Sequence, residues 1–160
     1  MKQFIIILMS LLPVSVVLSQ EDAALNVQEI LETKNFIFKA ETVSPARGRT
    51  RQLTTEYDVV VKPDTVICYL PYFGRAYTAP IDPSDGGIKF TSAEFNYILE
   101  KRKKQRWDLT ITPKDARDVQ ALYFTIFENG RASLRVNSTN RQGISFNGYV
   151  VKGKAEKRGF

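Results

Sequence analysis

The sequence predicts a mainly β protein: a single antiparallel domain, shaped as a β-barrel or a strongly curved sandwich, with about eight strands and an N-terminal helix. Apolar and polar residues alternate in short runs from Asn35 to Val151, which is the period of a half-buried strand. Turn-forming residues separate the runs about every 8–12 residues, a spacing typical of sandwiches and barrels. We expect one domain over residues 20–151 and a basic tail over residues 152–160.

A helix is expected at the beginning of the domain, over residues 21–34. Ala24, Val27 and Leu31 recur at helical spacing. Glu21 and Asp22 suit a helix N-terminus, where the helix dipole favours negative charge. We expect this helix to pack across the mouth of a barrel or on one face of the sheet.

The strands are indicated by apolar residues two positions apart. Some runs also carry apolar residues on the second face, and these positions require cover. They are Ile37, Val60, Ile67, Ile98 and Phe127. Asn129-Gly130 predicts a hairpin, because a primed two-residue turn needs positive φ at both central residues. A turn is expected at residues 62–64. The runs lie at residues 36–40, 57–61, 66–70, 88–90, 95–99, 107–111, 122–126, 132–136 and 144–151.

Residues 1–19 are expected to be a cleavable signal peptide. Lys2 is followed by a run from Phe4 to Leu18 that is almost wholly apolar, and Val17 and Ser19 fit the small-residue positions before a cleavage site. A permanent anchor needs about 20 apolar residues, so this shorter run favours cleavage and leaves no transmembrane segment. No cysteine follows the run, so we expect an exported protein, periplasmic or extracellular, that is not a lipoprotein.

The composition points away from the commonest catalytic and metal sites. The chain has no histidine and one cysteine, so it lacks the usual general base and cannot assemble a zinc site. Cys68 shares an alternating face with Val66 and Leu70 and is expected to be buried. Asp82 and Asp85 fit a turn better than a calcium loop. We assign no catalytic residue, no metal and no cofactor.

The modest positive excess, a formal net charge of +6 for the full sequence, favours an anionic partner. Such an excess is also common on soluble domains that bind neither lipid headgroups nor acidic glycans. For an exported chain, an anionic partner would be an envelope component such as an acidic glycan or a lipid headgroup, or another envelope protein. Nucleic acid is not expected outside the cytoplasm.

The candidate ligand-binding residues lie in one aromatic segment. Rings and a guanidinium surround a glycine there, and such groups can stack on sugars or flat ligands and bind an anion or carbonyl. Alternatively, the rings pack on the core and the arginine caps carbonyls, and we expect this structural role for Phe73. The four candidates are Tyr72, Phe73, Arg75 and Tyr77.

Two basic clusters are candidates for contact with an anionic surface. One precedes a strand, where alternate arginines would point the same way if the chain were extended. The other lies between two strands, where a solvated hairpin tip is the simpler interpretation. The first cluster comprises Arg47, Arg49 and Arg51, and the second comprises Lys101, Arg102, Lys103, Lys104 and Arg106.

The run Leu70-Pro71-Tyr72-Phe73-Gly74-Arg75-Ala76-Tyr77 resembles the domain of unknown function 4251 family, which comprises small exported proteins or lipoproteins of Gram-negative bacteria. The resemblance extends to residues 86–90, the strand around Trp107, residues 124–130 and residues 140–148, and so spans about residues 25–151. It implies location and domain extent but transfers no functional residue, because the family has no established activity. Many members carry a lipid-attachment cysteine, which this chain lacks.

Three function classes remain in view. We expect a non-enzymatic envelope domain that binds a ligand or partner. Alternatives are a glycan-directed hydrolase that uses carboxylates only, which is chemically feasible without histidine, and a purely structural envelope protein. The acidic residues that such a hydrolase would need fall on polar strand faces or turns: Asp58, Glu94, Asp108 and Glu128.

Overall fold

The computed structural model describes residues 26–77 and 86–153. The predicted signal peptide, the first residues of the predicted helix, Asp82 and Asp85, and residues 154–160 lie outside the described residues. The helix and strands of the described part are α1 (Val27–Glu32), β1 (Phe36–Pro45), β2 (Arg51–Val61), β3 (Val66–Pro71), β4 (Gly87–Ser92), β5 (Phe95–Arg102), β6 (Arg106–Pro113), β7 (Val119–Phe127), β8 (Arg131–Ser138) and β9 (Ile144–Lys152).

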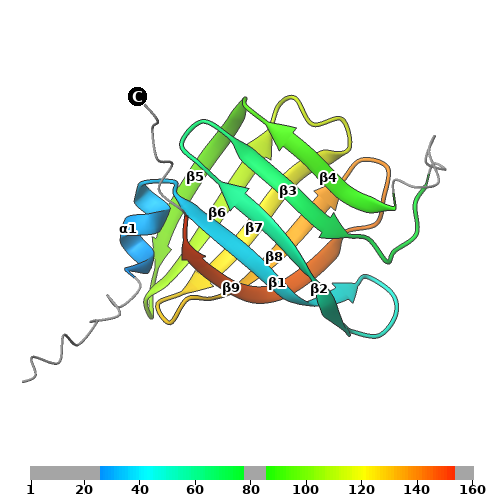
Figure 1. Cartoon of the computed structure of the whole chain (residues 1–160), viewed down its shortest axis with the longest axis horizontal. Helices are drawn as coiled ribbons and strands as arrows, with labels where there is room; N and C mark the ends of the chain where they lie inside the picture. The colour runs from blue at the N-terminus through cyan, green and yellow to red at the C-terminus, as the bar shows by residue number, and fades with distance from the viewer. Residues whose placement is uncertain (1–25, 78–85, 154–160) are drawn as a thin grey trace, which may run out of the picture.

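All nine strands form one antiparallel sheet that curls into a nearly closed barrel (Figure 1). The strand order is β4-β3-β2-β1-β9-β8-β7-β6-β5, so β1 and β9 lie side by side in the middle of the sheet and β4 and β5 are its edges. The predicted fold class is confirmed, with nine strands where about eight were expected. No helix in the described ranges is long and apolar enough to cross a membrane.

The inward-facing residues of the strands form one hydrophobic core. In this core the Phe124 ring meets the rings of Phe36 and Phe38 edge-on, with centroids 6.2 and 5.6 Å apart. Full burial of such a side chain contributes about 1.5–3 kcal/mol. Cys68 belongs to this core, as predicted, and burial raises the pKa of its thiol, so the residue acts as a small apolar side chain.

Helix α1 lies against one end of the barrel (Figure 1). It begins after Asn26, whose side chain accepts a hydrogen bond from the Glu29 N–H at 3.1 Å and caps the helix. Its apolar residues, Leu31 among them, are buried in the core, and the Tyr97 hydroxyl donates to the Leu31 carbonyl at 2.7 Å. The helix therefore packs at a barrel mouth, one of the two predicted arrangements.

The helix does not cover the second face of the sheet. Ile67, Ile98 and Phe127 are 38%, 56% and 43% exposed, whereas Ile37 and Val60 are half-buried, so these apolar positions are covered only in part. The expectation that all of these positions require cover is not met, because isolated apolar side chains on a protein surface are common and cost little.

The predicted hairpins are present, with one change of turn type. Lys62 N–H donates to the Thr65 carbonyl at 2.8 Å, which closes the β2–β3 turn. Between β7 and β8 only Gly130 has positive φ, at 79°, and its N–H donates to the Phe127 carbonyl at 2.9 Å. The loop therefore has three residues and one left-handed glycine, not the two-residue primed turn predicted from Asn-Gly.

A large irregularity interrupts the pairing of β1 and β2. Ala40 pairs with Tyr57 but Thr42 pairs with Gln52, so residues 53–56 of β2 lie opposite the single residue Glu41. Glu41 is also an extra residue relative to β9, which is a β-bulge. Strand β2 therefore arches away from the sheet at residues 53–56, a segment that we call the β2 arch.

The corner where β4 turns into β5 is held by one carboxylate. Asp115, in the loop after β6, receives hydrogen bonds from the hydroxyl of buried Ser92 and from the Ala93 N–H, the latter at 3.0 Å. These bonds, that of Ser92 first, lower the pKa of Asp115. The corner thus depends on the charged form of an exposed side chain.

Candidate functional site

The aromatic segment at residues 72–77 lies at the end of the barrel opposite α1 (Figure 1). It follows β3 and lies beside the β8–β9 loop. Tyr77 N–H donates to the Asn140 carbonyl at 2.7 Å, and Gln142 N–H donates to the Arg75 carbonyl at 3.1 Å. Ala76 forms an isolated antiparallel bridge in the same place. These backbone bonds fix the position of the segment.

Tyr72 has a structural role among the four aromatic-segment candidates. Its hydroxyl lies 2.8 Å from the Arg75 carbonyl and 3.1 Å from the Gln142 carbonyl, so its single proton can satisfy either acceptor. Burial raises the pKa of this hydroxyl, which keeps the proton in place. Gly74 lies close to it: a Cβ there would be 2.5 Å from the Tyr72 oxygen. A glycine is favoured at position 74 because the Tyr72 side chain lies so close to it, and not because the backbone has a positive φ there.

Arg141 joins this segment to the first residue of β4 and to the β6–β7 loop. Its guanidinium lies 5.2 Å from the centre of the Tyr72 ring. Nη1 donates to the Gly87 carbonyl at 2.8 Å, and Nη2 is 3.3 Å from the Asp118 carboxylate. The Arg141 side chain is only 11% exposed. The sequence pattern gave no signal for this arginine, because its partners lie far away along the chain.

The other three aromatic-segment candidates face solvent. Phe73 and Tyr77 are 42% and 68% exposed, and Arg75 is also exposed. Phe73 therefore differs from the expectation of a core role. The Arg51 guanidinium lies over the Phe73 ring, 5.2 Å from the ring centre. A residue of the first basic cluster is thus in contact with the aromatic segment.

The first basic cluster lies at the same end of the barrel, in the β1–β2 hairpin. Arg47 is in a bend beside Gly48, whose φ is +125°, and only Arg51 lies in a strand. The three arginines therefore do not share one strand face. We call the exposed set of six residues the arginine–aromatic end: Arg47, Arg49, Arg51, Phe73, Arg75 and Tyr77.

The second basic cluster lies at the opposite end, beside α1. Lys101 donates to the Gln28 side chain at 3.0 Å. Arg102 pairs with Glu100 and with Asp108, and Arg106 also pairs with Asp108. Lys103 and Lys104 are exposed at the hairpin tip. Three members of this cluster, Lys101, Arg102 and Arg106, thus form contacts within the protein. The fold does not bring the two basic clusters together.

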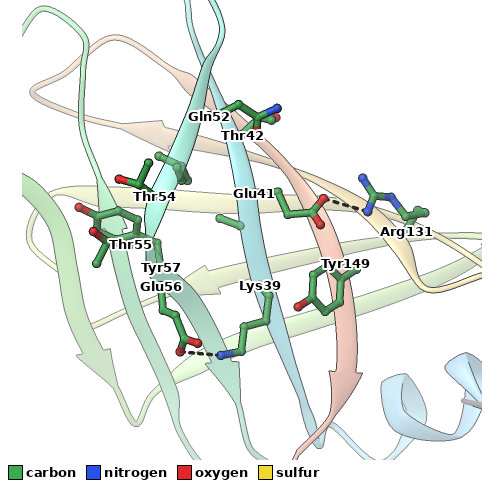
Figure 2. Close-up of a pocket in the computed structure, with 12 residues that line it drawn as sticks. Lys39, Glu41, Thr42, Gln52, Thr54, Thr55, Glu56, Tyr57, Arg131 and Tyr149 are labelled. Carbon is green, nitrogen blue, oxygen red and sulfur yellow. Dashed lines mark hydrogen bonds and ion pairs between the residues drawn. The ribbon is translucent and has the colours of Figure 1, made fainter.

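A hollow of about 530 Å³ opens on the outer face of the sheet beside the β2 arch (Figure 2). The sequence did not predict this hollow. Its one local signal is the break in alternation at Thr54-Thr55-Glu56, and its depth follows from the register shift opposite Glu41. The hollow is lined by Lys39, Ala40, Glu41, Thr42, Gln52, Leu53, Thr54, Thr55, Glu56, Tyr57, Arg131 and Tyr149.

The charged side chains of the hollow form two separate ion pairs. Lys39 Nζ lies 3.1 Å from Glu56, and Arg131 Nη1 lies 2.8 Å from Glu41. Figure 2 shows the two carboxylates turned to different sides, Glu41 toward β8 and Glu56 toward Lys39. The hydrogen bond with Glu56 raises the pKa of Lys39. Within residues 26–77 and 86–153 no cluster of three or more metal-ligating side chains is present.

Comparison with known proteins supports a shared fold. A family model described as domain of unknown function (DUF4251) matches residues 19–150. No curated protein matches the chain. Among solved structures, the crystal structure of a DUF4251 family protein from Bacteroides eggerthii is similar, with a TM-score of 0.58 and 14% sequence identity over 79% of this chain and 85% of that chain. At this identity the likeness concerns the fold alone.

Proposed function

Because the chain belongs to the DUF4251 family, a family of domains of unknown function, we propose its function from geometry and charge: it is an exported cell-envelope protein that binds an anionic ligand or partner at the arginine–aromatic end. Binding, and not catalysis, is the proposed activity. The ligand class is a glycan or lipid headgroup with negative charge, or an acidic surface of another envelope protein.

The observation that carries the proposal is the combination of exposed rings and guanidinium groups on a fixed frame. Phe73 and Tyr77 are the exposed rings, and Arg51 lies over the first of them. A guanidinium recognises carboxylate and phosphate groups in a planar, bidentate manner, and a ring adds stacking area. The backbone bonds of residues 75–77 and the Tyr72 hydroxyl hold this surface in place, which reduces the entropy that binding would cost.

The ion pairs of Glu41, Glu56 and Asp108 favour binding over hydrolysis. A glycosidase needs two carboxyl groups that flank one bond, and one of them must act as a general acid. Glu41 and Glu56 line one hollow, but each is ion-paired, they face apart, and the Glu56 side chain is 87% exposed. Asp108 is held by Arg102 and Arg106.

The proposal of export rests on residues 1–19. N-terminal sequencing of the protein recovered from the periplasm or the medium tests it, with Gln20 expected as the first residue. Recovery of the chain with Met1 intact would contradict export by signal cleavage.

Binding is tested with matched double variants. The probes are phosphatidylglycerol vesicles and a uronic-acid oligosaccharide. Arg51→Ala/Arg75→Ala is expected to weaken binding about tenfold or more, whereas Lys103→Ala/Lys104→Ala removes the same charge at the other end and is expected to change it less than about twofold. Equal losses in both variants, or no binding of either probe by the unaltered protein, would refute the proposed site.

The same experiment separates site from scaffold. Phe73→Ala is expected to reduce binding and to lower the free energy of unfolding by less than about 1.5 kcal/mol, because the ring is 42% exposed. Phe124→Ala, in the core, is the reference and is expected to cost about 3–5 kcal/mol. If Phe73→Ala costs as much as Phe124→Ala, the ring is part of the scaffold.

A further inference from the structure

The hollow beside the β2 arch is shaped by the backbone. Residues 53–56 have no register partner on β1, and β3 pairs only with Asp58 to Val61 of β2. The arch therefore stands off the sheet, and the bulged Glu41 and its neighbours form the floor. Gly148 of β9 makes this bulge possible, since a Cβ there would overlap the Lys39 carbonyl oxygen. The volume of about 530 Å³ lies within the range of small-molecule sites.

The charged side chains that line the hollow neutralise one another. Two cations, Lys39 and Arg131, are paired with two carboxylates, Glu56 and Glu41. An ionic ligand would have to displace one member of a pair and leave the other without its partner. The lining consequently suits a ligand without net charge, in contrast to the arginine–aromatic end.

The remaining polar groups of the hollow are available to a ligand. Gln52, Thr54, Thr55 and Tyr149 supply an amide and three hydroxyls, and in the part of the chain that the structure describes none of these side chains forms a hydrogen bond to the protein. In Figure 2 the Tyr149 hydroxyl lies on the side of Lys39. Amides and hydroxyls both donate and accept, which matches a ligand that carries hydroxyl groups.

Two tyrosine rings give the hollow an apolar component. Tyr57 and Tyr149 both line it. The Tyr57 ring is held by stacking on Tyr69, with centroids 5.4 Å apart and an angle of 27° between the planes. A ring beside donors and acceptors is the combination that a sugar needs, because a pyranose has apolar C–H faces and a polar rim.

We propose that this hollow is a binding site for a neutral saccharide, separate from the anionic-ligand site. Gln52 pairs with Thr42, which also lines the hollow, whereas Arg51 pairs with the buried core residue Val43 and lies over Phe73 at the barrel end. Directly paired residues point to the same face of a sheet. The two sites are thus on opposite sides of β2 and can be altered independently.

The test is a titration of the chain with neutral oligosaccharides of glucose, mannose and N-acetylglucosamine, at oligosaccharide concentrations up to about 5 mM. Binding is measured by changes in the amide NMR shifts and by calorimetry. Shifts are expected at Thr42, at residues 52–57 and at Tyr149. Because the ligand is uncharged, the affinity is expected to be the same at low and high salt.

Matched variants locate the site. Tyr149→Phe and Thr55→Val are each expected to weaken binding about three- to tenfold, as the loss of one hydrogen bond does. Tyr123→Phe removes a hydroxyl from another tyrosine on the outer face, 44% exposed on β7, and is expected to change nothing. Arg51→Ala/Arg75→Ala is also expected to leave saccharide binding intact, so failure of this site and of the anionic site can be distinguished.

Four outcomes would overturn the proposal, and the first three concern binding. They are the absence of binding by every neutral oligosaccharide, shifts that map away from residues 52–57, and an equal effect of Tyr123→Phe and Tyr149→Phe. Cleavage of a bound oligosaccharide would also overturn it, since the site would then be catalytic.

Discussion

Replacement of Arg141 by methionine tests whether one side chain holds the arginine–aromatic end together. Methionine keeps an unbranched apolar stem and removes the guanidinium. The charged hydrogen bond to the Gly87 carbonyl, at 2.8 Å, contributes about 1.5–3 kcal/mol. The contact with the Tyr72 ring adds about 0.5–1 kcal/mol. The Asp118 pair is discounted to below about 1 kcal/mol, because that carboxylate is 40% exposed.

The expected loss is therefore about 3 kcal/mol of a total of about 5–15 kcal/mol, or a decrease of about 10 °C in Tm. Urea and thermal unfolding measure it. The control is Arg135→Met on the exposed outer face of β8, which is expected to stay within about 0.5 kcal/mol of the unaltered protein. A loss below about 1 kcal/mol for Arg141→Met, or an equal loss for the control, would show that the loops are held by backbone bonds alone.

Three further substitutions test other features of the fold. Gly148→Ala is expected to lower the free energy of unfolding by an amount on the order of 2–3 kcal/mol, because the new Cβ would overlap the β1 bulge. The control is Gly143→Ala, whose Cβ would have no neighbour nearer than 3.5 Å, and it is expected to cost less than about 1 kcal/mol. Similar losses in the two variants would contradict the close approach of Gly148 to β1. Asp115 has a lowered pKa, so its contribution to the free energy of unfolding is present above about pH 4 and is lost as the pH falls through the lowered value. The Tm difference between Asp115→Asn and the unaltered protein is therefore expected to be largest at neutral pH and to shrink in acid. A constant difference would refute the role of the charge. Lys104 and Gln105 have φ of 62° and 49°, so Lys104→Asn/Gln105→Gly is expected to raise stability by about 1 kcal/mol in urea unfolding, and a decrease would mean that the native side chains compensate for the strain.

The sequence was sufficient to predict the sheet because its alternation marks the inward faces of the strands. Trp107, Leu109 and Ile111 alternate with polar residues, and all three are buried. The same local pattern predicted both the hairpins and a buried Cys68. The β7–β8 turn differed because Glu128 joins the loop, and a change of one residue in a hairpin loop changes the turn type.

The features that the sequence did not predict depend on contacts between distant residues. The β2 arch arises from a mismatch in register with β1, and alternation within one strand carries no information about the pairing of another. Arg141 is in contact with a carbonyl 54 residues away. The exposure of Phe73 depends likewise on where the barrel end closes, since an aromatic residue after a strand is equally compatible with the core and the surface.

The central position of β1 and β9 has a consequence for how the molecule can be attached. Phe36 pairs with Lys152, and Gly153 N–H donates to the Asn35 carbonyl at 3.0 Å, so the described chain starts and stops at the same pole, beside α1 (Figure 1). The arginine–aromatic end is at the other pole. Immobilisation of the protein on a sensor through either end of the described chain would leave this pole pointing away from the support. A tag inserted in the β1–β2 hairpin would reverse the orientation and hide it.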